Sequence, residues 1–185
     1  MLIFTILLTN FFSSTFNSSR QSFVHHLNSE ASFNNQIGVP LTLLRLRGDH
    51  QAAIVEIGTN HPGEMESLLS MARPRFGVIT SIGREHLEFF GGLEGVLLEE
   101  GFLAESLPED GCLFVNGDIE GLEKLRERCC SKIITVGESS QSDWIISRID
   151  TSNNETIFEL ISPKGDWNGV YRVNLLGRHN AQNAA

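Results

Sequence analysis

Residues 112–136 read CLFVNGDIEGLEKLRERCCSKIITV, which is a strand pattern, a helix pattern and a second strand pattern in succession. The runs 112–116 and 132–136 are almost continuously apolar, as is typical of strands buried on both faces. Between them, residues 119–129 form a charged, amphipathic helical pattern. Two parallel strands joined by a helix are therefore predicted for this stretch.

The same alternation extends toward the N-terminus. Residues 52–57 form a β-rich apolar run, and residues 63–71 have a helical pattern. Pro62 suits the first position of that helix, where a backbone N–H is not needed. Residues 76–82, FGVITSI, predict another strand, and residues 93–107 predict another helix. This order predicts an α/β fold, a mostly parallel sheet flanked by helices on both faces.

The pattern changes after Gly137. Shorter alternating runs at 144–149, 156–161 and 170–175 are separated by polar turns, which predicts a small antiparallel β portion near the C-terminus. Residues 177–185 then begin a helix that reaches the last residue without a C-cap. We therefore expect the chain to be incomplete at this end.

Composition narrows the class of protein. The 185 residues are 41% hydrophobic, enough for one main core. A net charge of −9 argues against nucleic acid or an anionic membrane as a partner. The three cysteines, of which Cys129 and Cys130 are adjacent, form no even disulfide framework, so a reducing cytoplasm is expected. There is no C-x-x-C spacing, and no structural zinc site is predicted.

The first residues, MLIFTILLTNFFSSTF, contain a short apolar run. It lacks the basic flank and the clear cleavage site of a secretion signal. It is also shorter than the roughly 20 apolar residues that a membrane span needs, so no span is expected. Residues 1–22 are therefore predicted to form a separate N-terminal segment. This segment either pairs with the sheet as a strand or is disordered.

Polar residues follow two of the predicted strands. In an open parallel sheet, ligands bind beyond the carboxyl ends of the strands. Glu56 lies at the end of one strand, and His86 follows the next strand along the chain. Together they could bind a divalent cation; the alternative is that Glu56 caps a turn and His86 is an ordinary loop residue. Glu99 and Glu100 follow on a helix, where adjacent side chains face different ways, so at most one of the two is expected to be a ligand and the other solvated.

Short sequence motifs give no direct evidence of nucleotide binding or of serine-hydrolase catalysis. The chain contains no G-x-x-x-x-G-K-[ST], no G-x-G-x-x-G after a strand and no G-x-S-x-G. The tetrapeptide RGDH at 47–50 is too short to indicate adhesion.

Four longer segments resemble the Mur ligase family, in particular the branch that adds D-alanyl-D-alanine to UDP-N-acetylmuramoyl tripeptide. They are SFNNQIGVPLTLLRL (32–46), AIVEIGTNHPGEM (53–65), TSIGREHLEFFGGLEGV (80–96) and GRHNAQNAA (177–185). The resemblance implies that residues 23–185 are the family's central, ATP-binding domain, incomplete at both ends. It also implies a monomeric cytoplasmic enzyme of peptidoglycan synthesis that uses ATP and Mg²⁺. Such ligases form an amide bond by converting a carboxylate into an acyl phosphate, which the incoming amine attacks.

The resemblance also implies roles for individual residues. Glu56 matches the family's glutamate on the magnesium ion bound at the phosphate loop, and His86 matches the histidine that helps to hold a second magnesium ion. Glu100 aligns with a lysine that many members carry in carbamylated form, and it would supply a carboxylate directly, which suits Mg²⁺; the alternative is a solvated side chain. The residues on the substrate side are Asn34, Asn35, Asn60 and His61, and those at the adenine and ribose are His179, Asn180 and Asn183.

One departure from the family is important. Its phosphate loop should lie upstream of Ser32, where residues 11–21 read FFSSTFNSSRQ. Loss of even one donor to a transition state typically costs about 100- to 1000-fold in rate. We therefore expect the chain to be inactive alone, without that loop and without the family's N- and C-terminal domains. Two alternatives remain, a non-catalytic substrate-binding module and a fragment of a folate-polyglutamate-type ligase, which shares the Gly-His-Asn ending.

Overall fold

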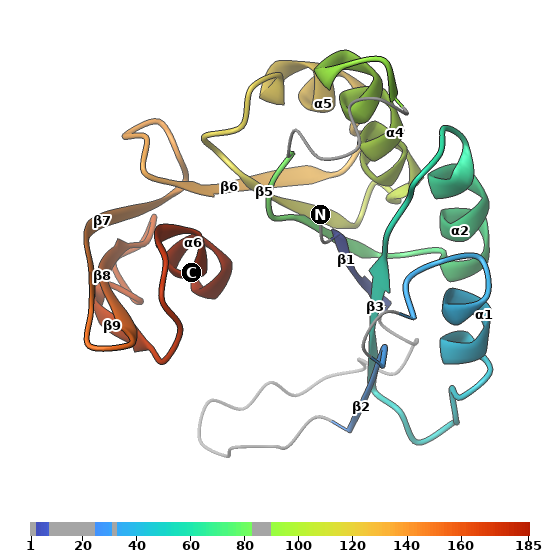
Figure 1. Ribbon diagram of the computed structural model, residues 1–185, viewed down its shortest axis with the longest axis horizontal. Helices are drawn as coiled ribbons and strands as arrows, with labels where there is room; N and C mark the ends of the chain where they lie inside the picture. Colours follow the sequence, from blue (N-terminus) through green and yellow to red (C-terminus); the bar gives the residue numbers. More distant parts are fainter. Residues whose placement is uncertain (1–2, 8–24, 31–32, 83–89) are drawn as a thin grey trace.

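The computed structural model describes residues 3–7, 25–30, 33–82 and 90–185 (Figure 1). Nine strands form one sheet in the order β2-β3-β1-β4-β5-β6-β7-β8-β9. The strands are β1 (Ile3–Leu7), β2 (His26–Asn28), β3 (Ala52–Ile57), β4 (Phe76–Ile79), β5 (Cys112–Asn116), β6 (Lys132–Gly137), β7 (Trp144–Ser152), β8 (Glu155–Ile161) and β9 (Gly169–Val173). The helices are α1 (Gly38–Leu43), α2 (Glu64–Ala72), α4 (Leu93–Ser106), α5 (Leu122–Arg128) and α6 (Arg178–Ala184).

The sheet confirms the predicted α/β fold. β2 pairs with β3 in parallel, and β4, β5, β6 and β7 form successive parallel pairs. β7, β8 and β9 pair in antiparallel fashion, as their shorter alternating runs predicted. Strands β4 to β7 therefore share one direction, and the carboxyl ends of β4, β5 and β6 meet at one edge of the sheet.

β1 differs from the parallel strands around it in its direction. It lies between β3 and β4 and is antiparallel to both, with Ile3 level with Ile57 on one side and Ile79 on the other. Of the two alternatives for residues 1–22, residues 3–7 therefore take the strand, while 8–22 lie outside the described residues. Because Leu7 is level with Ala53, the chain leaves β1 at the amino ends of β3 and β4.

Helices cover the sheet unequally. Figure 1 shows α1, α2, α4 and α5 along one face, and α6 on the other side against β7, β8 and β9. A larger core lies under the first four helices, and a smaller one lies between α6 and β7–β9. The larger core includes Ile57, Ile79, Leu103, Leu113 and Leu125, all fully buried. None of the helices in the described ranges combines the length and apolar character that a membrane crossing requires.

The predicted start of one helix needs correction. Pro62 is not the first residue of α2, because the helix begins at Glu64 with Gly63 as its N-cap. Gly63 has a φ of 86°, a left-handed conformation that glycine adopts without steric cost. The first N–H groups of α2 are then satisfied by acidic side chains, described below.

Candidate functional site at the carboxyl edge

Glu56 and Asn34 are brought together at the end of β3. The side-chain amide of Asn34 donates to Oε1 of Glu56 at 2.8 Å, although the two residues are 22 apart in sequence. The backbone carbonyl of Asn34 accepts from the N–H of Gly58 at 2.8 Å. A Cβ at Gly58 would lie only 2.8 Å from the Asn34 amide nitrogen, so a larger residue there would displace this contact. The half-buried Glu56 carboxylate is thus oriented by a neighbouring loop.

Asn35 has a different, local contact. Its side-chain oxygen accepts hydrogen bonds from the N–H groups of Ile37 and Gly38, each at 3.0 Å. These bonds satisfy two donors at the start of α1, as an N-cap side chain does. Sequence reasoning placed Asn35 with the substrate-side residues. In the structure, its side-chain oxygen instead accepts hydrogen bonds at the start of α1.

Asn35→Ala should therefore lower the free energy of unfolding by about 1 kcal/mol, the usual cost of losing an N-cap. Urea unfolding monitored by circular dichroism would measure the change. The matched control is Gln36→Ala, because Gln36 is exposed beside it. Equal stability of the two variants would contradict a capping role.

Asn60 and His61 lie in the loop that follows β3. Their backbone N–H groups both donate to Oε2 of Glu64, at 2.9 and 3.2 Å. The hydrogen bond from the Asn60 N–H, together with the one from His61, lowers the pKa of Glu64 against the opposing effect of burial. The loop is therefore folded onto the first turn of α2, and both predicted substrate-side residues are exposed at this edge.

Glu99 is not solvated, so the expectation of one solvated glutamate in the pair was wrong. It is only 3% exposed. Its two carboxylate oxygens accept from the N–H groups of Gly63 and Met65, each at 2.8 Å. The N-terminus of a helix presents unpaired N–H groups and a partial positive charge, which together stabilise a buried carboxylate. Glu99 of α4 therefore caps α2, from 34 and 36 residues away in sequence.

Glu100 is fully buried. Neither of its carboxylate oxygens has a hydrogen-bond partner among the described residues. Removal from water raises the pKa of Glu100 to about 8, and repulsion from Glu99 acts in the same direction. Glu100 is thus a buried carboxyl group whose charged form lacks compensation in the described part of the chain. His86, the third predicted metal ligand, lies outside the described residues.

A cavity of about 290 Å³ opens where β4, β5 and β6 end beside α6. Its polar lining comes from Thr80, Asn116, Gln182 and Asn183, and valine and phenylalanine side chains provide apolar walls. The Asn116 amide donates to the Thr80 carbonyl at 3.1 Å and to Oε1 of Gln182 at 3.4 Å. These bonds hold α6 against the strand ends. Polar groups that converge in a mostly apolar cavity are typical of a small-molecule site.

Of the three predicted nucleotide-binding residues, only Asn183 lines this cavity. The Asn180 amide instead donates to the Leu176 carbonyl at 2.9 Å, and His179 is exposed. Asn116 and Gln182 were missed by sequence reasoning. The position of Asn116 at a strand end was the signal that could have found it.

Comparisons with known proteins agree with this architecture. Residues 3–185 match the family profile described as the Mur ligase middle domain. The UDP-N-acetylmuramoyl-tripeptide–D-alanyl-D-alanine ligase of Escherichia coli K12 is 33% identical over 160 residues, covering 85% of this chain and 35% of that protein. The enzyme of the same name from Bacillus subtilis 168 is 34% identical over 153 residues, covering 83% and 32%.

Structural comparison gives the same result. The crystal structure of MurF from Acinetobacter baumannii matches with a TM-score of 0.81 and 30% identity, covering 88% of this chain and 35% of that one. MurF from Thermotoga maritima in complex with ADP shares the fold, with a TM-score of 0.71 at 20% identity. The chain spans about a third of the length of these relatives. A family match over nearly all of its residues shows that the chain belongs to the Mur ligase family.

Proposed function

We propose that this chain is the ATP-handling domain of a ligase that joins D-alanyl-D-alanine to a UDP-N-acetylmuramoyl tripeptide. The relatives named above support this step rather than folate polyglutamylation. The structural observation that carries the proposal is Glu100, a fully buried carboxyl group without a partner among the described residues. The charged form of such a group is costly unless a charge of opposite sign lies beside it.

A magnesium ion is the counter-charge that fits these residues. Carboxylate oxygens are hard ligands of the kind that Mg²⁺ prefers. By the resemblance, Glu56 would hold one such ion and His86 would help to hold a second, while Glu100 would supply a further carboxylate. Asn34 would orient the Glu56 carboxylate through its 2.8 Å hydrogen bond. When bound, Mg²⁺ neutralises charge on the phosphoryl group that is transferred. With a net charge of −9, the chain has little other means of attracting an anionic substrate.

The remaining residues divide between two substrates. The 290 Å³ cavity lined by Asn116 and Asn183 suits a flat base, with His179 and Asn180 on the helix beside it. Asn34, Asn60 and His61 would face the muramoyl peptide from the loops around β3. In the reaction, a peptide carboxylate oxygen attacks the γ-phosphorus and ADP leaves. The amine of D-alanyl-D-alanine then attacks the acyl carbon, and phosphate is expelled with the amine proton lost to solvent.

We expect turnover to require more than these 185 residues, since they contain no phosphate-loop motif. A phosphate loop follows a strand and precedes a helix at the ligand edge of such sheets. β1 occupies the slot between β3 and β4 but runs the opposite way, so the chain leaves it at the amino edge. This observation favours a second candidate function for the chain alone, binding without catalysis. We further propose that the protein is a monomer and that it is located in the cytoplasm.

Calorimetric titration of the chain with ADP in the presence of Mg²⁺ tests the nucleotide part of the proposal. We expect weak binding that Asn183→Ala weakens by about tenfold, the loss expected for one hydrogen bond in a pocket. Asn174→Ala is the control, because Asn174 is exposed. If neither ADP nor UDP-muramoyl tripeptide binds the unaltered chain, both candidate functions are wrong; if only the muramoyl peptide binds, the binding module is favoured.

A further inference from the structure

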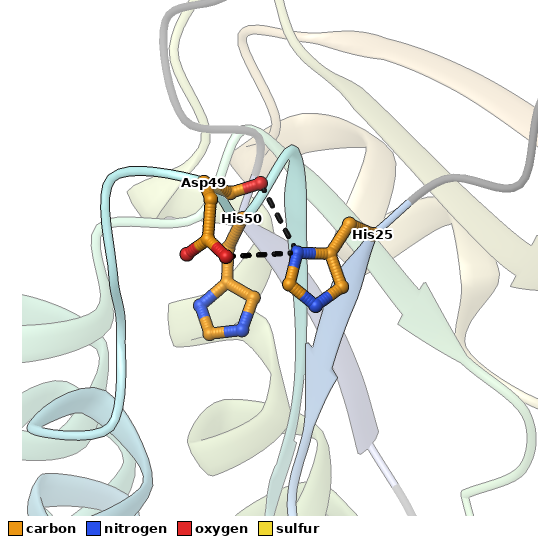
Figure 2. A group of neighbouring side chains, drawn as sticks. All are labelled: His25, Asp49 and His50. Atoms are coloured by element: carbon orange, nitrogen blue, oxygen red, sulfur yellow. Dashed lines mark hydrogen bonds and ion pairs between the residues drawn. The ribbon is translucent and has the colours of Figure 1, made fainter.

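Three potential metal ligands, His25, Asp49 and His50, lie together at the amino edge of the sheet (Figure 2). One ligand atom from each residue lies within 4.8 Å of the other two. Nδ1 of His25 is 3.4 Å from Oδ2 of Asp49, and the two imidazole rings are 4.8 Å apart between centroids. This group lies at the opposite end of β3 from Glu56, so it is separate from the carboxyl-edge site.

The parallel pairing of β2 with β3 builds this cluster. His26 is level with Ala52, and one residue earlier the N–H of Gln51 donates to the His25 carbonyl at 2.7 Å. His25 is thereby fixed beside the residues that lead into β3, which are the end of the RGDH stretch. Residues that are 24 apart in sequence meet because both strands begin at the same edge.

Asp49 is held in place by a neighbouring arginine, and a metal ion would have to replace at least one of its contacts. Arg47 contacts Asp49 through both carboxylate oxygens, at 3.2 and 3.3 Å. This contact holds the pKa of Asp49 below its usual value and keeps the group ionised. His25 and Asp49 are exposed, whereas His50 is buried beside an open hollow of about 500 Å³. An ion could therefore reach His25 and Asp49 directly from solvent, whereas His50 is reached from the hollow, which the other two ligands do not line.

The ligand types indicate which metals fit. Two imidazoles and one carboxylate suit Zn²⁺ and similar divalent transition metals, whereas Mg²⁺ prefers oxygen ligands alone. Ligand atoms on one tetrahedral zinc ion lie about 3.3 Å apart, given bonds of about 2.0 to 2.1 Å. The separations of up to 4.8 Å would have to shorten by up to about 1.5 Å, which the exposed His25 side chain permits. Nδ1 of His50 accepts from the Arg47 N–H at 3.0 Å, and a coordinate bond at His50 would replace that hydrogen bond.

We propose that His25, Asp49 and His50 bind a divalent transition-metal ion of the zinc class, with water completing its coordination. The ion joins the start of β2 to the start of β3. β2 is a three-residue strand at one edge of the sheet, so few backbone hydrogen bonds hold it to β3. The bound ion therefore stabilises the attachment of β2 to the sheet. The site is structural and does not depend on the ligase proposal.

Calorimetric titration of the metal-free chain with zinc chloride tests the site. All proteins carry Cys130→Ser, which removes an exposed thiol that would compete for zinc. Apart from any zinc bound by the carboxylates of the carboxyl-edge site, we expect one site that His25→Ala and Asp49→Asn each weaken about 100-fold, because each variant removes one ligand. Both residues are exposed, so neither substitution should disturb the fold. His26→Ala is the matched control, because it removes the neighbouring imidazole outside the cluster and should leave zinc affinity unchanged.

Thermal unfolding provides the second measurement. Zinc should raise the melting temperature of the unaltered protein and of His26→Ala but not of His25→Ala, because only a site formed in the folded state stabilises it. Excess Mg²⁺ should not displace the zinc. Equal zinc affinity in His25→Ala and the unaltered protein, absence of binding at millimolar zinc, or displacement by Mg²⁺ would each overturn the site.

Discussion

In the absence of divalent cations, the free energy of unfolding should fall steeply as the pH rises toward 8, and Glu100→Gln should abolish most of this fall. The pKa of Glu100 is raised from 4.5 in the unfolded chain to about 8 in the folded one. Between these values the folded state binds the extra proton, so stability is fully present below pH 4.5 and is lost as the pH approaches 8. At 1.36 kcal/mol per pKa unit, the loss is about 4 to 5 kcal/mol.

Urea unfolding at a series of pH values measures this dependence. Glu94→Gln is the control, because Glu94 is exposed on the first turn of the same helix and forms only a surface ion pair with Lys124. We expect its pH profile to follow that of the unaltered protein. Identical profiles for Glu100→Gln and the unaltered protein would show that Glu100 is already compensated in the cation-free fold.

Glu99→Ala should destabilise the protein by about 3 kcal/mol. The substitution removes the carboxylate that accepts from the Gly63 and Met65 N–H groups. The Met65 N–H is buried, and an unpaired buried donor costs about 1 to 3 kcal/mol; the Gly63 N–H is at an exposed residue and contributes less. The loop carrying Asn60 and His61 would lose the support of the capped first turn. Guanidinium unfolding would measure the effect, with Glu66→Ala, on an exposed position of α2, expected to change stability by at most about 0.5 kcal/mol.

Glu99→Gln separates the charge from the shape of the side chain. Glutamine has one carbonyl oxygen in place of two carboxylate oxygens, so it can satisfy only one of the two N–H groups well. Its stability should fall between that of the unaltered protein and that of Glu99→Ala. Full stability in Glu99→Ala would mean that water replaces the carboxylate, contrary to a buried cap.

The strands were the most predictable part of the fold. β3 and β5 begin and end at the residues expected from their apolar runs, because a buried parallel strand needs almost every side chain to be apolar. β2 and α1 were not predicted. β2 has only three residues, two of them polar and exposed, so its pairing with β3 leaves no periodic signal in the sequence. The direction of β1 could not be predicted either, because it depends on the pairing of β1 with its neighbours in the sheet.

The candidate site was predictable at the level of residue types but not of contacts. Helical spacing alone indicates that adjacent glutamates point in different directions, but it did not predict that both would be buried. It could not indicate that α2 would offer its N–H groups to Glu99, because those donors lie more than 30 residues away in sequence. The cluster of His25, Asp49 and His50 was missed for the same reason, since only the parallel register of β2 and β3 brings its members together.

The most direct test is the effect of Mg²⁺ on thermal unfolding at about pH 8, compared between the unaltered chain and Glu100→Gln. Burial makes the charged form of Glu100 unfavourable, and a bound cation would compensate it. We predict that millimolar Mg²⁺ raises the melting temperature of the unaltered chain and leaves that of Glu100→Gln unchanged. An equal rise in both proteins, or no rise in either, would contradict a cation site at Glu100.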